Sequence, residues 1–269
     1  MDPIKPLIDA LHAEGRLRIW SLVITVFGDS VQHRGGKVSS VRLQRLLGRV
    51  GVEPGALRTA LSRLNREGWV KGVRSGRTSI YRLTANGQKH FVDATGHIYA
   101  APRTAPVDQW EIAVGTQPEG LSVAPGVVLR PAGEQSAKNA DIVVRGDLAR
   151  LTAHARKRLL SRSHVTALGV LFSDLAALDG VDLDPLDAAA ARTLLVHRWR
   201  RLVLRYPEVP AEVMPAGLPS VDPRAAVASA YQALTPAAEA WLDHAEGEME
   251  AMAPPTQDIE SRFRSGDEA

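Results

Sequence analysis

The chain has 269 residues, of which 45% are hydrophobic and 23% are charged, a composition typical of globular proteins with a sizeable core. No apolar run approaches the roughly 18 residues that a membrane-spanning helix needs, and the start of the chain shows no signal-peptide pattern. The absence of cysteine excludes disulfides, thiolate nucleophiles and cysteine-bound metal sites. These features predict a cytoplasmic protein without a membrane partner.

Charge is distributed unevenly along the chain. Residues 1–99 contain 16 Lys and Arg against 7 Asp and Glu, whereas residues 206–269 contain 3 against 12. A basic first third is typical of proteins that bind a polyanion, because Lys and Arg next to phosphates release counterions. A solvated basic face would have the same composition, so the pattern of residues has to decide between the two.

The first hundred residues predict an ordered series of helices and strands. Apolar spacing, Pro54 at a first helical position and Gly76 in a turn mark their limits. The predicted helices are residues 16–27, 40–48, 54–67 and 84–99, and the predicted hairpin strands are residues 69–74 and 79–83. Two helices at a steep angle followed by a β-hairpin are typical of a winged helix-turn-helix.

The rest of the sequence predicts further domains and an α+β fold class overall. Residues 1–99 are the expected winged helix-turn-helix domain. Residues 107–180 predict a small central α+β domain, with one of its strands expected over 164–172. Residues 181–252 predict a C-terminal helical domain, and residues 253–269, with mixed charge, predict a flexible tail.

The predicted helix over residues 54–67 has two distinct faces. At about 100° per residue, Leu57, Leu61 and Leu64 fall on one arc and are expected to pack on the preceding helices. The opposite arc carries small side chains near the start of the helix and arginines near its end. This pattern suits a helix that enters a DNA groove, where Arg can bind guanine bidentately. The candidate DNA contacts on this helix are Arg58, Thr59, Ser62, Arg63 and Arg66.

Further arginines flank that helix. Arg42, Arg45 and Arg49 are three and four residues apart, so they share one side of the preceding helix and are candidates for phosphate contacts. Arg74 and Arg77 flank the turn of the predicted wing, which suits contacts in or along the minor groove. The same arginines would also serve a solvated surface, or a winged helix that docks a protein partner.

Several stretches resemble the PaaX family of transcriptional regulators. They are Ser21–Ser30 with Phe-Gly-Asp, Arg34–Gly36, Val41–Leu47, Leu57–Leu64, Glu67–Trp69, Tyr81–Thr84, Val123–Gly126, Leu195–Arg205, Pro207–Pro215 and Tyr231–Leu242. The resemblance extends over nearly the whole chain. It implies a homodimeric repressor that binds a pseudo-palindromic operator in double-stranded DNA. It also implies release by an aryl- or acyl-CoA effector of a catabolic pathway, such as phenylacetyl-CoA, and a ferredoxin-like central domain.

A second basic cluster lies in the helical pattern that ends near residue 205. Clustered arginines with a tryptophan could bind the phosphates of a CoA thioester and stack on a ring. The candidate effector-binding residues are His197, Arg198, Trp199, Arg201 and Arg205. The alternative is that this basic helix pairs with the acidic segment from Glu239 to Glu250.

The sequence predicts no enzyme, no cofactor and no metal site. No P-loop, G-x-S-x-G or G-x-G-x-x-G motif occurs, and the histidines lack metal-ligand spacing. The central region also lacks the paired carboxylates of a metal nuclease. We therefore expect a DNA-binding transcriptional repressor. The alternatives are a protein-interaction scaffold without sequence-specific DNA binding, and an RNA-binding regulator.

Overall fold

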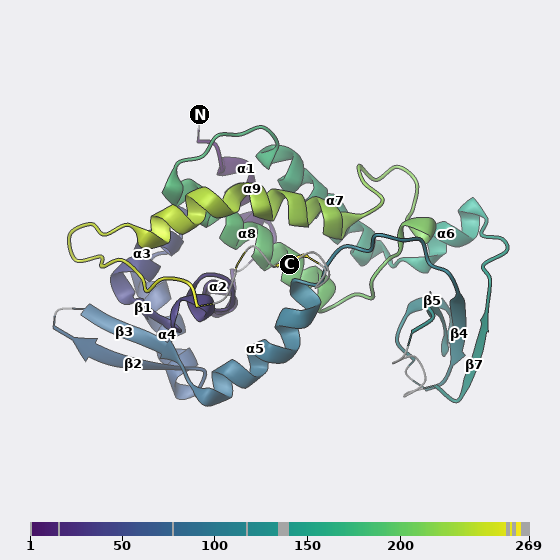
Figure 1. The fold of residues 1–269 in the computed structure, drawn as a ribbon, viewed down its shortest axis with the longest axis horizontal. Helices are drawn as coiled ribbons and strands as arrows, with labels where there is room; N and C mark the ends of the chain where they lie inside the picture. The colour runs from purple at the N-terminus through teal and green to yellow at the C-terminus, as the bar shows by residue number, and fades with distance from the viewer. Residues whose placement is uncertain are drawn as a thin grey trace.

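The computed structural model describes residues 2–15, 17–76, 78–116, 118–133, 140–256, 259 and 262–264. Figure 1 shows a larger lobe with most of the helices and a three-stranded sheet, and a smaller lobe with a four-stranded sheet. Among the described residues, no helix is both long enough and apolar enough to cross a membrane.

The described elements follow one another in this order. The helices are α1 (Lys5–Ala13), α2 (Ile19–Val26), α3 (Ser40–Arg49), α4 (Pro54–Arg66), α5 (Ala85–Ile98), α6 (Ala153–Leu159), α7 (Arg162–Leu178), α8 (Pro185–Val203) and α9 (Pro223–Asp243). The strands are β1 (Lys37–Ser39), β2 (Val70–Ser75), β3 (Thr78–Leu83), β4 (Trp110–Val114), β5 (Leu121–Ala124), β6 (Val127–Pro131) and β7 (Ile142–Gly146). α2 continues into a π-helical turn, Phe27–Val31.

The first sheet and its helices follow the predicted series closely. β1, β3 and β2 lie side by side and are antiparallel, and Gly76 supplies the left-handed residue of the β2–β3 turn with φ of 58°. The Thr84 hydroxyl caps α5 by accepting a hydrogen bond from the Gly87 amide at 3.0 Å. A Cβ on Gly87 would lie 2.3 Å from the Trp69 carbonyl oxygen, so the close approach of α5 to the residue before β2 requires glycine there.

The second sheet has the order β5-β6-β4-β7, with antiparallel neighbours. Along the described chain its four strands come first and α6 follows, whereas a ferredoxin-like domain has a helix after its first strand. The structure thus departs from the ferredoxin-like expectation. The strand expected over residues 164–172 is also wrong, because this segment lies in α7. Its apolar residues suit either element, and the Ser161 hydroxyl caps the helix.

The core of the larger lobe is built around α8. Residues on every side of this helix are buried, among them the run Ala188–Ala191, whose small side chains let neighbouring helices approach closely. α9 packs along α8, and α1, α2, α3, α5 and α7 also contact it. Since α7 packs on α1, α8 and α9, the helical bundle begins well before residue 181, the boundary expected from the sequence.

A buried ion network joins the π-helical turn to the helical bundle. The Asp29 carboxylate accepts hydrogen bonds from the hydroxyls of Tyr99 at 2.7 Å and Tyr231 at 2.9 Å. It also pairs with Arg192 at 3.1 Å and Arg262 at 2.9 Å. Burial acts to raise the pKa of Asp29, but the two arginines outweigh burial and hold this pKa below its usual value. The network therefore connects the first domain to α8, α9 and the C-terminal segment.

The described part of the predicted tail packs on this network. Ile259 and Phe263 are buried, and the Phe263 ring lies 5.4 Å from the rings of both Tyr99 and Tyr231. Arg262 contributes the ion pair to Asp29. The prediction of a flexible tail over residues 253–269 is therefore wrong for these residues, because two apolar side chains and one arginine find partners in the core.

Candidate nucleic-acid interface

α4 presents one apolar and one polar face, as its sequence predicts. Its buried residues are Leu57, Ala60, Leu61 and Leu64. The five candidate DNA contacts, Arg58, Thr59, Ser62, Arg63 and Arg66, are all exposed. α4 packs on α2, α3 and β2 through the apolar face, so the cationic face points away from the protein.

The exposed residues of α4 differ in whether their side chains already have partners within the protein. Arg63 donates to the Glu67 carboxylate at 2.7 Å, and its guanidinium lies 5.2 Å from the centre of the Trp20 ring. The Thr59 hydroxyl donates to the Gly55 carbonyl oxygen of its own helix at 3.0 Å. Within the described part of the chain, Arg58 and Arg66 have no acidic partner, so both are available to phosphates or base edges.

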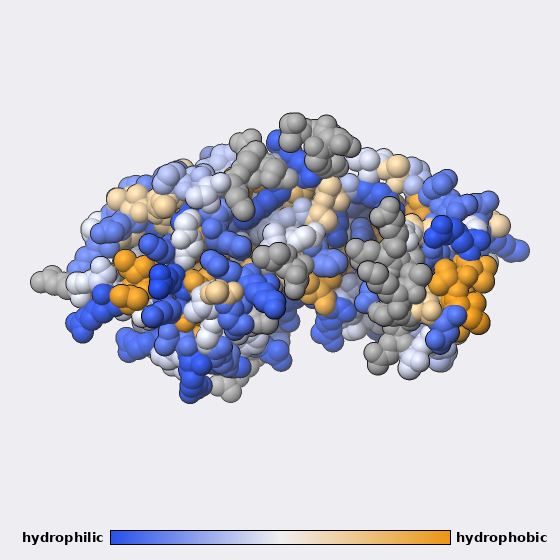
Figure 2. All heavy atoms as spheres, turned by 60° about the horizontal axis from the view of Figure 1, so that its bottom comes forward, coloured by the Kyte–Doolittle hydropathy of each residue, from blue (hydrophilic) through white to orange (hydrophobic). Residues whose placement is uncertain are grey.

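The hairpin of β2 and β3 extends beside α4, at the residues where the sequence predicts a wing (Figure 1). Arg74 is exposed near its tip, and its Nε donates to the Gly76 carbonyl oxygen at 3.4 Å. Arg77, the other wing arginine expected to contact DNA, lies outside the described residues. Hydrophilic side chains cover most of this lobe in the view of Figure 2.

Sequence reasoning missed a row of cations across the first sheet. Lys37 of β1 and Lys71 of β2 both lie directly opposite Arg82 of β3, and all three side chains are exposed. They border an open groove of about 450 Å³ at the start of α5. Like charges directly opposite on a sheet repel one another, and a bound anion relieves this repulsion. The alternation of Lys37, Lys71 and Arg82 with the buried Val38, Val70 and Leu83 was the available signal.

α3 does not provide the phosphate-binding row expected of it, because Arg42 is buried. Its side chain is 1% exposed and donates to the backbone carbonyl oxygens of Trp241, His244 and Glu250 at 2.6–2.7 Å. Burial lowers the pKa of Arg42 to about 10, with a smaller contribution from the neighbouring Arg34. Arg42 thus holds the segment after α9 and cannot contact a phosphate, which corrects the sequence prediction.

The other two arginines of α3 are partly engaged. Arg49 pairs with Asp187 of α8 at 2.5 Å and with Asp2 at 2.6 Å, which raises its pKa. Arg45 is 58% exposed and lies 3.8 Å from the equally exposed Glu246. Of the three residues, Arg45 alone remains open to a phosphate, since an exposed pair at this distance is weak.

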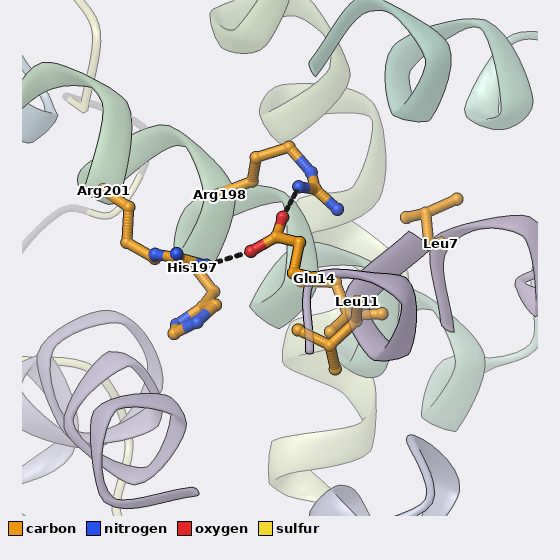
Figure 3. Close-up of a pocket in the computed structure, with 7 residues that line it drawn as sticks. Leu7, Leu11, Glu14, His197, Arg198 and Arg201 are labelled. Carbon is orange, nitrogen blue, oxygen red and sulfur yellow. Dashed lines mark hydrogen bonds and ion pairs between the residues drawn. The ribbon is translucent and has the colours of Figure 1, made fainter. Parts of the chain in front are cut away.

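The arginines of α8 expected to bind an effector are also paired within the protein. Figure 3 shows the Glu14 carboxylate between Arg198 and Arg201, and Arg198 pairs with Asp174 as well. His197 is buried beside them. The side chains that surround this position leave no cavity that a water molecule could enter.

The remaining effector candidates point elsewhere. The Trp199 indole N–H donates to the Ile98 carbonyl oxygen at 2.8 Å in the core, and Arg205 lies beyond the end of α8 with its guanidinium 5.3 Å from the centre of the Tyr206 ring. His197 Nδ1 lies 2.9 Å from the Thr25 hydroxyl. The five predicted residues therefore do not converge on a ligand site, because core packing, Glu14 at the end of α1 and Asp174 of α7 engage four of them.

Glu239, in the acidic segment from Glu239 to Glu250, does not pair with the basic end of α8 that the sequence offered as its partner. Glu239 pairs with Arg34 at 2.6 Å and with Arg192 at 2.7 Å, and His33 lies 3.3 Å away. These contacts hold the pKa of Glu239 far below its usual value despite its burial. Among the described residues, Arg192 of α8 pairs with α9, whereas Arg198 and Arg201 near the end of α8 pair with Glu14 and Asp174. In the described residues, no group of three or more acidic or histidine side chains could hold a metal ion.

Comparisons with known proteins place this architecture in a family. Residues 18–87 match the family described as PaaX-like protein, and residues 163–244 match the PaaX-like protein C-terminal domain. The chain belongs to the PaaX family. Its first matched segment contains α2, α3, α4 and the β2–β3 hairpin, and its second contains α8, α9 and all of α7 except its first residue.

A curated relative extends this PaaX assignment. The chain is 29% identical over 262 residues to the protein named Transcriptional repressor PaaX from Escherichia coli (strain K12), and the match covers 82% of each chain. As a member of the PaaX family, the protein is a transcriptional regulator and not an enzyme. Among solved structures it is similar to the uncharacterized protein Rv0674 from Mycobacterium tuberculosis, with 18% identity and a TM-score of 0.47, covering 82% of this chain and 97% of the other.

Proposed function

We propose that this protein represses transcription by binding duplex DNA through a winged helix-turn-helix formed by α2, α3, α4 and the β2–β3 wing. One observation carries the proposal: α4 buries its leucines and exposes Arg58 and Arg66 without an acidic partner in the described part of the chain. A helix with small residues near its start can enter the major groove, where free arginines bind guanine edges or phosphates.

The neighbouring cations support contacts to the DNA backbone. Arg45, Arg74 and the row Lys37, Arg82 and Lys71 surround α4 and the wing on exposed positions. Each cation that neutralises a phosphate releases counterions, so affinity is expected to fall steeply as salt rises.

We also propose that the protein binds its operator as a homodimer. A single short helix buries too little surface for tight specific binding, and two copies related by a two-fold axis read a pseudo-palindromic site. For release from DNA we propose an acyl-CoA thioester such as phenylacetyl-CoA, on the basis of the family resemblance. Such a ligand would stabilise the folded protein, so a panel of acyl-CoA thioesters should contain one that raises its melting temperature.

Equilibrium binding to fluorescent duplexes tests the DNA proposal. The probes are the promoter region upstream of the protein's own gene, a random duplex of equal length and a duplex RNA, each at several salt concentrations. We expect promoter DNA to bind at least ~10³-fold more tightly than random DNA. Duplex RNA should bind weakly, because its deep and narrow major groove excludes a helix.

Two other outcomes would replace the proposal. Equal, weak binding to all three duplexes would favour a winged helix that docks a protein partner. Preference for the RNA duplex would favour an RNA-binding regulator. A substitution of Arg150, which is exposed in the smaller lobe, provides a control that should leave DNA binding unchanged.

A further inference from the structure

The edge strand β7 carries an apolar surface that nothing in the described chain covers. β7 pairs with β4 on one side only and forms one edge of its sheet. Ile142 is 58%, Val143 36% and Val144 61% exposed. Figure 2 shows a hydrophobic patch on the end of the molecule that carries this sheet.

Such an edge is unusual in a natural protein. Exposed edge strands present unpaired backbone groups, and they are usually interrupted by proline, an inward charge or a bulge. None of these devices interrupts the central Ile142–Val144. Apolar side chains on both faces of the strand are exposed, so the strand is suited to continue the sheet with another strand rather than to receive a helix on one face.

The charges in and beside β7 indicate which kind of strand could pair with it. Asp141 directly precedes β7, and Arg145 lies within it, each two residues from Val143. When two copies of β7 run antiparallel with Val143 opposite Val143, Asp141 of each copy lies opposite Arg145 of the other. The same alignment places Ile142 opposite Val144. The strand is therefore complementary to itself in both charge and hydrophobicity.

The surroundings of Arg145 favour an additional acidic partner. Its guanidinium donates to the buried Glu111 carboxylate at 2.7 Å, and Arg130 donates to the same carboxylate at 3.1 Å. Two guanidinium groups carry more charge than one carboxylate can balance. Arg145 nevertheless remains 55% exposed, so an aspartate from a second chain could reach it.

We propose that β7 pairs antiparallel with β7 of a second copy of this chain, with the two-fold axis passing at Val143. The two four-stranded sheets then form one continuous sheet, and the apolar edge becomes buried. This pairing is independent of the proposed DNA binding, and it is tested without DNA. It also supplies the two-fold symmetry that a pseudo-palindromic operator requires.

Single-cysteine cross-linking tests the register. The chain contains no cysteine, so Val143→Cys introduces one thiol per protomer. Residues directly opposite on antiparallel strands are close enough to form a disulfide, so we expect Val143→Cys to give a covalent dimer under mild oxidation. Val73→Cys and Val221→Cys, at positions 52% and 57% exposed on other elements, are the controls and should give at least ~10-fold slower dimer formation. Equal rates in all three variants would overturn the proposal.

Sedimentation equilibrium of the full chain tests the energetics. Replacement of both Ile142 and Val144 by Lys places four like charges in the proposed interface, and we expect the dimer dissociation constant to rise by at least ~10-fold. Both residues are exposed, so the melting curve of the monomer should stay unchanged. A Lys variant that dimerises like the wild type, or a wild type that stays monomeric at all concentrations, would contradict the pairing. Either result would leave half-site DNA binding untouched.

Discussion

Arginines exposed on α4 and arginines buried among the helices are the same residue type, but they differ in exposure and in partners. Arg58 and Arg66 are exposed and have no acidic partner in the described chain. Arg42 and Arg192 are each 1% exposed, and carbonyl oxygens or carboxylates surround them. The first pair can exchange water for DNA phosphates, whereas the second pair cannot leave its partners without leaving buried polar groups unsatisfied.

This contrast shows that charge along the sequence does not by itself locate a binding surface. The two groups of arginines differ in the elements that pack against the helix on which they lie. α4 packs on β2, whereas α8 packs along α9, and Arg42 of α3 donates to carbonyl oxygens of α9 and of the segment after it.

Arg192→Met should cause the largest loss of stability. The substitution leaves the buried Asp29 and Glu239 without a shared cation, and breaking a buried pair in this way costs about 3–5 kcal/mol. Urea denaturation followed by circular dichroism measures the change. Arg66→Met is the matched control and should change the unfolding free energy by less than about 0.5 kcal/mol. Equal effects of the two substitutions on the unfolding free energy would show that the buried arginine contributes no more to stability than the exposed one.

Arg42→Met should destabilise the protein by about 2 kcal/mol, because three carbonyl oxygens lose their donor. The folded variant should still bind DNA with wild-type affinity, since Arg42 does not reach the surface. Urea denaturation and duplex binding on the same sample check both parts. A loss of DNA affinity in a fully folded variant would restore Arg42 to the interface.

Stability should also fall as the pH drops below 6.5, partly through His197. Burial lowers the pKa of His197 to about 3, so the folded state stays neutral there while the unfolded state takes up a proton below pH 6.5. Between pH 7 and pH 5 this histidine should cost about 2 kcal/mol of unfolding free energy. His197→Gln should flatten the pH profile of the unfolding free energy by that amount. An unchanged slope would mean that His197 titrates normally in the folded protein.

Lys71→Gln should have the smallest effect and act on DNA binding alone. Loss of one phosphate contact should reduce the slope of log affinity against log salt by about 1 for promoter and random duplexes alike. Lys5→Gln, on the exposed side of α1, is the control. An unaltered slope would remove the cation row of Lys37, Arg82 and Lys71 from the DNA interface.

The sequence predicted local structure well where local signals decide it. The two faces of α4 and the glycine turn of the β2–β3 hairpin follow from spacing and backbone preference, and both are found. The strand expected over residues 164–172 was wrong because an apolar run of that length suits a buried helix equally well.

Contacts between distant segments account for the other errors. Arg42, Arg198 and Trp199 resemble surface residues in the sequence, and their partners lie far away in the chain at Trp241, Asp174 and Ile98. No periodicity reveals such pairings. The cation row of Lys37, Lys71 and Arg82 was missed for the same reason, since strand register joins residues that are far apart in sequence.

The most direct test of the central claim is the promoter affinity of the double variant Arg58→Ala, Arg66→Ala at constant salt. We expect an affinity loss of at least ~10-fold relative to wild type, together with an unchanged unfolding free energy. A double variant that is fully folded and binds the promoter like the wild type would show that α4 does not face DNA.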